Sequence, residues 1–158
     1  MRIKTIPSSW ISGTGCRLDC NPYMSGAIDT QVKLDALKCE KQNLSKLTKG
    51  HNGGIFNGPK FSRTWVDDRF YGVPFLGSTS MLKFDLDGIP LLSKNLAFSS
   101  KLAYLEIKAG MILISCSGTI GKMVYVRPDM IGMWSSQHIM KVVPDEIKIP
   151  PGYLYAYL

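Results

Sequence analysis

The chain has 158 residues, of which 45% are hydrophobic and 20% are charged, with a net charge of +7. This composition is typical of a folded globular domain and excludes an intrinsically disordered chain. No apolar run reaches the roughly 18 residues that a membrane-spanning helix needs. The first seven residues lack the apolar segment and the cleavage site of a signal peptide, so we expect a cytoplasmic protein without a membrane partner.

The excess of cations favours a polyanionic partner, because each phosphate that Lys or Arg neutralises releases condensed counterions. The cations are scattered along the chain, so folding has to assemble any basic surface. The four cysteines, Cys16, Cys20, Cys39 and Cys116, lack the two close ligand pairs of a zinc site. We therefore expect small buried thiols, with no metal and no cofactor in this chain.

The first predicted element in chain order is a long N-terminal helix over residues 25–49. Apolar residues recur there at mainly helical spacing, from Ile28 to Leu47, with lysines between them. The glycines that follow, from Gly50 onward, end the pattern. The lysines favour a solvated helix face, and phosphate contact is the alternative.

Short apolar and β-branched runs follow, separated by glycine, proline and aspartate turns. Strands are predicted at 54–57, 61–66, 73–76, 102–107, 111–115, 122–126 and 138–143. Residues 78–83 are predicted as a helical turn, and a last helix begins at the proline pair 150–151. The predicted fold class is α+β, with the long N-terminal helix packed on a bent, mostly antiparallel, barrel-like sheet.

Several stretches, in the same order as in the family, resemble the target recognition domains of type I restriction–modification specificity subunits. The densest is 113–126, which contains a strand, a Ser-Gly-Thr-Ile-Gly turn and a second strand. The other similar stretches are 61–66, 72–82, 92–94, 134–138 and 151–158. The resemblance covers about residues 55–158, and the N-terminal third matches loosely.

The resemblance implies sequence-specific binding of double-stranded DNA by a chain that is not itself an enzyme. Residues 1–150 would form the first recognition domain, and 151–158 would begin a conserved spacer helix. The implied partners are methyltransferase subunits, which bring S-adenosylmethionine, and translocase–nuclease subunits, which bring ATP. Because the sequence stops inside a helical pattern, we expect it to be part of a longer specificity subunit.

DNA-contacting residues are expected in the polar loops between the strands. Lys, Arg, Ser and Thr hold phosphates, whereas Arg or Lys reads guanine and Asn or Gln reads adenine. The nearby aromatic residues Phe61, Trp65, Phe70 and Tyr71 are expected in the core. The predicted DNA-binding residues are Lys60, Arg63, Ser78, Ser80, Lys83, Lys94, Ser117, Thr119, Lys122, Arg127 and Gln137.

The turn at 117–122 has two interpretations. In the structural one, Gly118 and Gly121 supply positive φ between two strands and Ile120 packs into the core. In the functional one, the glycines let the backbone approach DNA while the turn's hydroxyls and Lys122 touch phosphate. The sequence leaves both open.

Three other functions stay open. One is the analogous recognition domain of a fused type II enzyme, and another is a protein-interaction module. The third is a nuclease, since Asp129, Glu146 and Lys148 spell a signature in which two carboxylates hold Mg²⁺, although prolines flank the last two residues. The glycine-rich loop of an ATPase and the Asn/Asp-Pro-Pro-Tyr/Phe motif of a methyltransferase do not occur in the sequence, so no catalytic residue is predicted.

Overall fold

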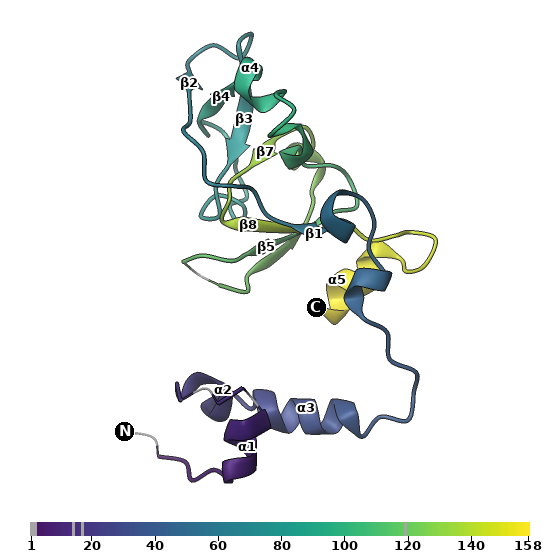
Figure 1. Ribbon diagram of the computed structural model, residues 1–158. Helices are drawn as coiled ribbons and strands as arrows, with labels where there is room; N and C mark the ends of the chain where they lie inside the picture. Colours follow the sequence, from purple (N-terminus) through teal and green to yellow (C-terminus); the bar gives the residue numbers. More distant parts are fainter. Residues whose placement is uncertain (1–2, 14, 17, 119) are drawn as a thin grey trace. The chain divides into compact units, whose positions relative to one another are not determined.

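The computed structural model describes residues 3–13, 15–16, 18–118 and 120–158 (Figure 1). The chain forms two compact units, Met1–Lys41 and Gln42–Leu158, which we call unit 1 and unit 2. Within the described residues, no helix combines the length and the apolar character that crossing a bilayer requires.

Unit 1 consists of short helices joined by turns. They are α1 (Ser8–Gly13), α2 (Asn21–Met24) and α3 (Ala27–Asp35). Lys4 ties the entry segment to these helices: its Nζ donates a hydrogen bond to the Tyr23 carbonyl at 3.0 Å and lies 3.8 Å from the Asp29 carboxylate. Among the described residues of unit 1, Tyr23 is the one buried hydrophobic side chain. Unit 1 therefore has very little core.

The long helix predicted over 25–49 is wrong. α3 has nine residues and ends at Asp35, and the later part of the range contains a single 3-10 turn, η1 (Leu44–Lys46), which belongs to unit 2. The helical pattern had joined apolar residues of two units. Val32 of unit 1 is 59% exposed, whereas Leu44 packs against the core of unit 2. A helix is stabilised mainly by burying one apolar face, and no such face runs through the whole range.

Unit 2 contains two four-stranded sheets, in the orders β1-β8-β5-β6 and β2-β4-β3-β7 (Figure 1). The strands are β1 (Ile55–Phe56), β2 (Trp65–Val66), β3 (Gly72–Leu76), β4 (Leu91–Ser93), β5 (Ile112–Ser115), β6 (Met123–Tyr125), β7 (Trp134–Ser135) and β8 (Ile139–Val142). The helical elements besides η1 are η2 (His51–Gly54), α4 (Lys94–Ala97), η3 (Ala103–Leu105), η4 (Pro128–Met130) and α5 (Pro151–Tyr157).

The fold is α+β, but the prediction of one barrel-like sheet was wrong. β7 pairs in parallel with β3, with Phe75 opposite Trp134, whereas β8 pairs with β1 and β5. The chain therefore crosses from one sheet to the other at 136–138. This crossing divides the strands between two sheets, and the described strands close no barrel.

Six of the predicted strand ranges coincide with an observed strand: five of these strands are shorter than predicted, and β3 begins one residue earlier. The predicted last helix is confirmed as α5. The prediction for 102–107 was wrong, because Leu102 and Leu105 are one 3-10 turn apart and pack into the same cluster. Residues 78–83 form hydrogen-bonded turns instead of a regular helix. All four cysteines are free and exposed, so the expectation of buried thiols was also wrong.

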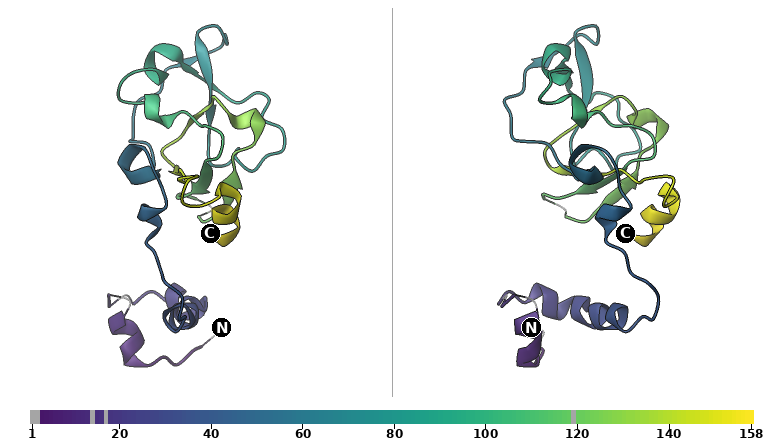
Figure 2. Two further views of the ribbon diagram at one scale, coloured as in Figure 1. Left: turned by 90° about the vertical axis from the view of Figure 1, so that its right-hand side faces the viewer. Right: turned by 45° about the vertical axis from the view of Figure 1, so that its right-hand side comes forward.

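The core of unit 2 lies between and beside the two sheets, because alternate residues of β5 and β8 point to opposite faces. Leu113 and Ile139 share a cluster with Leu76 of β3, which connects the sheets. Ile112 and Val142 point the other way and pack against Leu154 of α5. Figure 2 shows α5, in yellow, beside this sheet. Trp134 of β7 belongs to a further cluster with residues of β3, β4 and α4.

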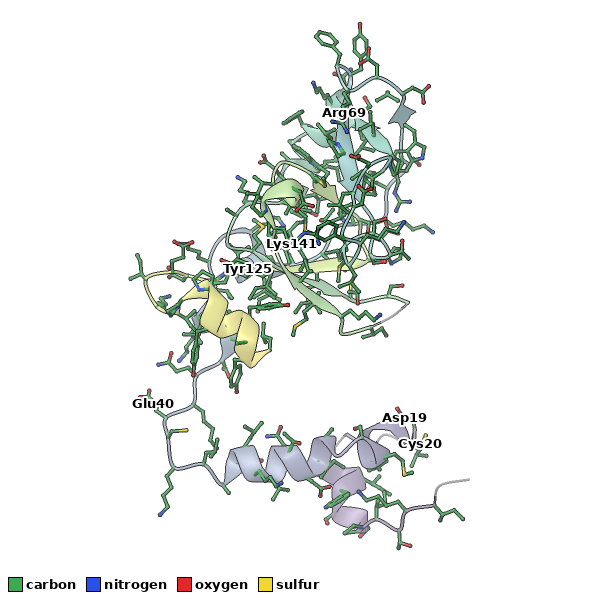
Figure 3. The ribbon with its side chains drawn as sticks, turned by 180° about the vertical axis from the view of Figure 1, so that it is seen from behind. Asp19, Cys20, Glu40, Arg69, Tyr125 and Lys141 are labelled. Atoms are coloured by element: carbon green, nitrogen blue, oxygen red, sulfur yellow. The ribbon has the colours of Figure 1, made fainter. Side chains whose placement is uncertain are left out.

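One lysine lies inside this core. Lys141 of β8 shares the face of Ile139 and is 0% exposed (Figure 3). Its neighbours across the sheet are Phe56 and Leu113, and its Nζ lies 5.2 Å from the centroid of the Phe56 ring. Nζ is buried without a hydrogen-bond partner among the described residues. The fold therefore carries an ammonium group in an apolar environment.

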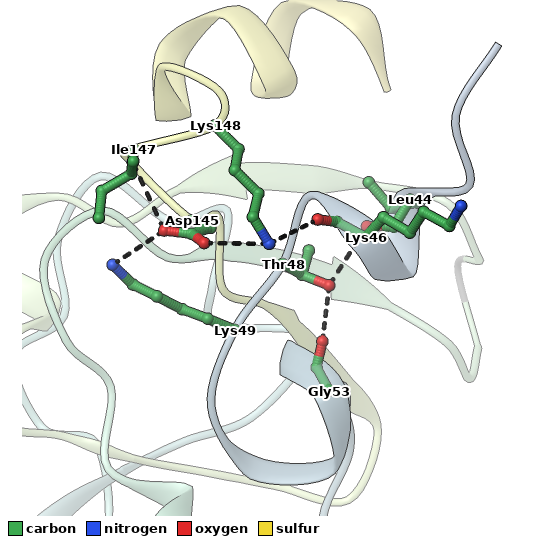
Figure 4. Close-up of polar contacts among 8 residues, drawn as sticks. All are labelled: Leu44, Lys46, Thr48, Lys49, Gly53, Asp145, Ile147 and Lys148. Carbon is green, nitrogen blue, oxygen red and sulfur yellow. Dashed lines mark hydrogen bonds and ion pairs between the residues drawn. The ribbon is translucent and has the colours of Figure 1, made fainter.

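A polar cluster ties the start of unit 2 to the turn that follows β8 (Figure 4). The Asp145 carboxylate lies 3.4 Å from Lys49 Nζ and 3.3 Å from Lys148 Nζ, and Lys148 Nζ also donates to the Lys46 carbonyl at 3.0 Å. Desolvation alone would raise the pKa of Asp145, but hydrogen bonds from Lys148, the Ile147 amide and Lys49 outweigh it and lower that pKa. The cluster holds η1 and the residues before α5 together.

Candidate nucleic-acid interface

Three loops meet where the two sheets of unit 2 join: the loop after β3 (77–83), the crossing at 136–138 and the β5–β6 hairpin loop (116–122). Backbone hydrogen bonds connect them. The Ser136 amide donates to the Leu76 carbonyl at 3.0 Å, and the Cys116 amide donates to the His138 carbonyl at 2.9 Å. The crossing segment is thus fixed to both sheets.

Two adjoining hollows, of about 360 and about 270 Å³, lie over these loops and share Ser78 and Thr79 in their walls. Arg63 and His138 line the first hollow, and Lys122 lines the second. We call this surface the junction face. The polar and aromatic residues that line it are Arg63, Trp65, Phe75, Ser78, Thr79, Ser80, Ser115, Ser117, Lys122, Ser136 and His138. We include Gln137, which lines neither hollow but binds Arg63.

Arg63 is held in one orientation on the junction face. Its Nη2 donates a hydrogen bond to Gln137 Oε1 at 2.8 Å, and its guanidinium carbon lies 5.2 Å from the Phe75 ring centroid and 5.9 Å from that of Phe61. The ion pairs found within the described part of the chain do not include Arg63. Its charge therefore faces solvent uncompensated by a carboxylate.

Gln137 is fixed in turn by residues from three segments. Its backbone carbonyl accepts hydrogen bonds from Asn57 Nδ2 at 3.2 Å and from Cys116 Sγ at 3.8 Å. Its Nε2 lies 3.3 Å from His138 Nε2, so both ends of the side-chain amide are engaged. Such bracing prepares the Arg63–Gln137 pair to meet a ligand without reorganisation.

The hairpin between β5 and β6 gives the junction face its second cation, Lys122. Gly118 and Gly121 have φ of 75° and 81°, as the sequence predicts. Ile120 is 75% exposed, so the expectation that it packs into the core was wrong: it lies at the loop tip, beyond the ends of the paired strands. Thr119, another predicted contact residue, lies outside the described residues.

The structure brings six of the eleven predicted DNA-binding residues together on the junction face: Arg63, Ser78, Ser80, Ser117, Lys122 and Gln137. Four others line neither hollow: Lys60, Lys83, Lys94 and Arg127.

Two of these four cations are engaged elsewhere. Lys94 Nζ donates to the Phe70 carbonyl at 2.8 Å, at the base of the loop between β2 and β3. Arg127 donates two hydrogen bonds to Asp129, at 3.0 and 2.8 Å. These bonds raise the pKa of Arg127 and lower that of Asp129. Arg127 is therefore already paired, whereas Lys60 and Lys83 are simply exposed.

Some residues of the junction face were not predicted as DNA contacts. Trp65 was expected in the core but is 46% exposed, because β2 is an edge strand of two residues. Phe70 and Tyr71, also expected inside, are 72% and 62% exposed on the following loop. His138, which lines the first hollow, was also not among the predicted contacts. The acidic turn immediately after Trp65 was a signal that the strand is short and marginal.

No family model matches the chain, and no curated protein matches it significantly. The interpretation of the junction face therefore depends on its own chemistry.

The residues of the nuclease signature take separate partners. Asp129 pairs with Arg127, and Lys148 contacts Asp145 and a backbone carbonyl. Among the described residues, no group of three or more His, Cys, Asp or Glu side chains is placed to hold a metal ion. The junction face, by contrast, brings cations, hydroxyls and an amide together around the two hollows.

Proposed function

We propose that the chain binds double-stranded DNA in a sequence-specific manner through the junction face. The observation that carries this proposal is the gathering of Arg63, Lys122 and several serine hydroxyls around two connected hollows. No described carboxylate lines either hollow, whereas four aspartates, Asp67, Asp85, Asp87 and Asp129, line a separate groove beside β4. Acidic side chains are thus segregated from the surface that would meet phosphates.

The residue types of the junction face match the two kinds of contact that a sequence reader makes. Lys122 and the serine hydroxyls suit phosphate oxygens, which set the register of the protein on the duplex. The planar guanidinium of Arg63 suits base edges in the major groove. The braced Arg63–Gln137 pair lies between loops that offer hydroxyls, so one approach of a duplex would reach both kinds of group.

The resemblance to type I target recognition domains supports the same function and adds a role. In that role the chain supplies DNA recognition and no catalysis or cofactor. Methyltransferase subunits would modify the recognised DNA, and translocase–nuclease subunits would cleave unmodified DNA. These subunits are proposed partners of the chain.

Salt dependence tests the proposal. We expect the logarithm of the affinity for a labelled duplex to fall linearly with the logarithm of salt concentration, as counterion release requires. Replacing Lys122 by alanine should reduce the magnitude of the slope of this log–log plot by about 1, the amount that one phosphate contact contributes. The measurement is fluorescence anisotropy over a salt series.

The control is Lys101→Ala, which removes an exposed lysine that lines neither hollow and should leave the salt slope unchanged. Absence of binding at low salt, or binding that salt does not weaken, would contradict the proposed function.

A further inference from the structure

Arg63 differs from Arg127, the other arginine with a resolved side-chain partner in unit 2, in what holds it. Arg127 is bidentate to the Asp129 carboxylate, so its charge is compensated and several of its donors are used. Arg63 is held by the neutral oxygen of Gln137, through one hydrogen bond. A guanidinium has five N–H donors. Arg63 therefore keeps its positive charge and most of its donors for a ligand.

The environment of Arg63 also fixes where those donors point. The Phe61 and Phe75 rings stand nearly perpendicular to each other, at 84°, and the guanidinium lies over both. Phe75 is buried and packs in the cluster that contains Leu92 and Trp134. A phosphate contact needs only charge within reach, whereas a base contact needs two donors in a set direction. The bracing of Arg63 meets the second requirement.

The amide of Gln137 is less suited to reading a base itself. Adenine is read by an amide whose oxygen accepts from N6 while its nitrogen donates to N7. In Gln137 the oxygen already accepts from Arg63 and the nitrogen faces His138 Nε2. Gln137 therefore acts on Arg63, as a positioning residue.

Resting on the proposed DNA-binding function, we propose that Arg63 reads a guanine through its O6 and N7 atoms and that Gln137 positions Arg63 for this contact. The ligand class is a guanine base in the major groove of a duplex, since O6 and N7 present two adjacent acceptors that match two guanidinium donors. A methionine in the place of Arg63 has no donor, so it cannot make this contact.

The test selects bound duplexes from a pool with a randomised central segment and sequences them. Wild-type protein should enrich guanine at one position, by about fivefold to a hundredfold for a bidentate contact. Arg63→Met should lose that preference while the other positions keep theirs. Gln137→Ala should weaken the guanine preference, and Gln137→Glu should abolish it by pairing Arg63 with a carboxylate.

Lys122→Ala is the matched control, because loss of a phosphate contact lowers affinity for all sequences alike. Circular dichroism of each variant checks that the fold is retained. The inference is overturned if Arg63→Met keeps the guanine preference, if this variant lowers the affinity for all sequences equally, or if wild-type protein binds duplexes without preferring guanine. If wild-type protein binds no duplex at all, the proposed function itself fails, so the two failures are distinct.

Discussion

Replacing Lys141 by methionine should raise the free energy of unfolding at pH 7 by about 4 kcal/mol. This is the free energy that corresponds to the lowered pKa of Lys141, at about 1.4 kcal/mol per pKa unit. Burial lowers the pKa of the Lys141 ammonium group from its ordinary value of 10.5 to about 7. Methionine has a similar length and no charge, so it fills the same space beside Phe56 and Leu113 without the desolvation cost.

The effect depends on pH in a defined direction. Between pH 7 and 10.5 the unfolded chain holds a proton on Lys141 that the folded chain has largely lost. The wild-type protein therefore becomes more stable as pH rises through this range, relative to the Lys141→Met variant. The free energy of unfolding of the variant should exceed that of the wild type by a largest, constant amount below about pH 7. Above pH 7 this difference should fall by about 1.4 kcal/mol per pH unit.

Urea unfolding of both proteins from pH 6 to 10 measures this difference. Lys122→Met is the matched control, because it exchanges the same residue types at an exposed position, where no ammonium group is buried. An advantage for Lys141→Met that stays constant from pH 6 to 10 would show that the folded protein does not desolvate Lys141.

Trp134→Ala should destabilise unit 2 by about 3–5 kcal/mol, the usual cost of removing a large buried aromatic side chain. Trp134 is 2% exposed, and its Nε1 donates to the carbonyls of Ala97 and Leu102, both at 3.0 Å. Alanine leaves a cavity and also leaves those two acceptors without their donor. Chemical denaturation followed by circular dichroism measures the loss.

Two variants resolve the contributions to this loss. Trp134→Phe retains most of the apolar contact and removes the N–H. It should therefore lower the free energy of unfolding by less than Trp134→Ala, but by more than a substitution of an exposed residue. Trp65→Ala removes a tryptophan that is 46% exposed and should cost well under half as much. Equal losses for Trp65→Ala and Trp134→Ala would contradict the assigned role of Trp134 in the core.

The sequence predicted the parts of the fold that depend on local chemistry. Alternating apolar residues located most strands, and Gly118 and Gly121 have the positive φ expected of a tight connection. The long helix failed because periodicity carries no information about which residues share a core: Val32 and Leu44 belong to different units. The parallel pairing of β7 with β3 was also beyond reach, because it joins segments about 60 positions apart through a register that only tertiary packing sets.

The sequence indicates which residue types form the candidate site, but it does not indicate which residues pair with one another there. Arg63 and Arg127 look alike in the sequence as loop cations. The Arg127–Asp129 pair has a short-range signal, since the two residues are two positions apart. The partner of Arg63 is Gln137, 74 positions away, and only the crossing between sheets brings them together. Their different environments are a property of the fold.

The three-residue link between β7 and β8 has little tolerance for a change in length. Its first residue is bonded to β3 and its last to the residue after β5, so both of its ends are anchored. Inserting or deleting one residue there would slip β8 by one position against its neighbours, and side chains of a strand alternate between faces. Lys141 would then face the cluster beneath α5, and Val142 would face the cluster between the sheets, so one change in length would disturb both cores.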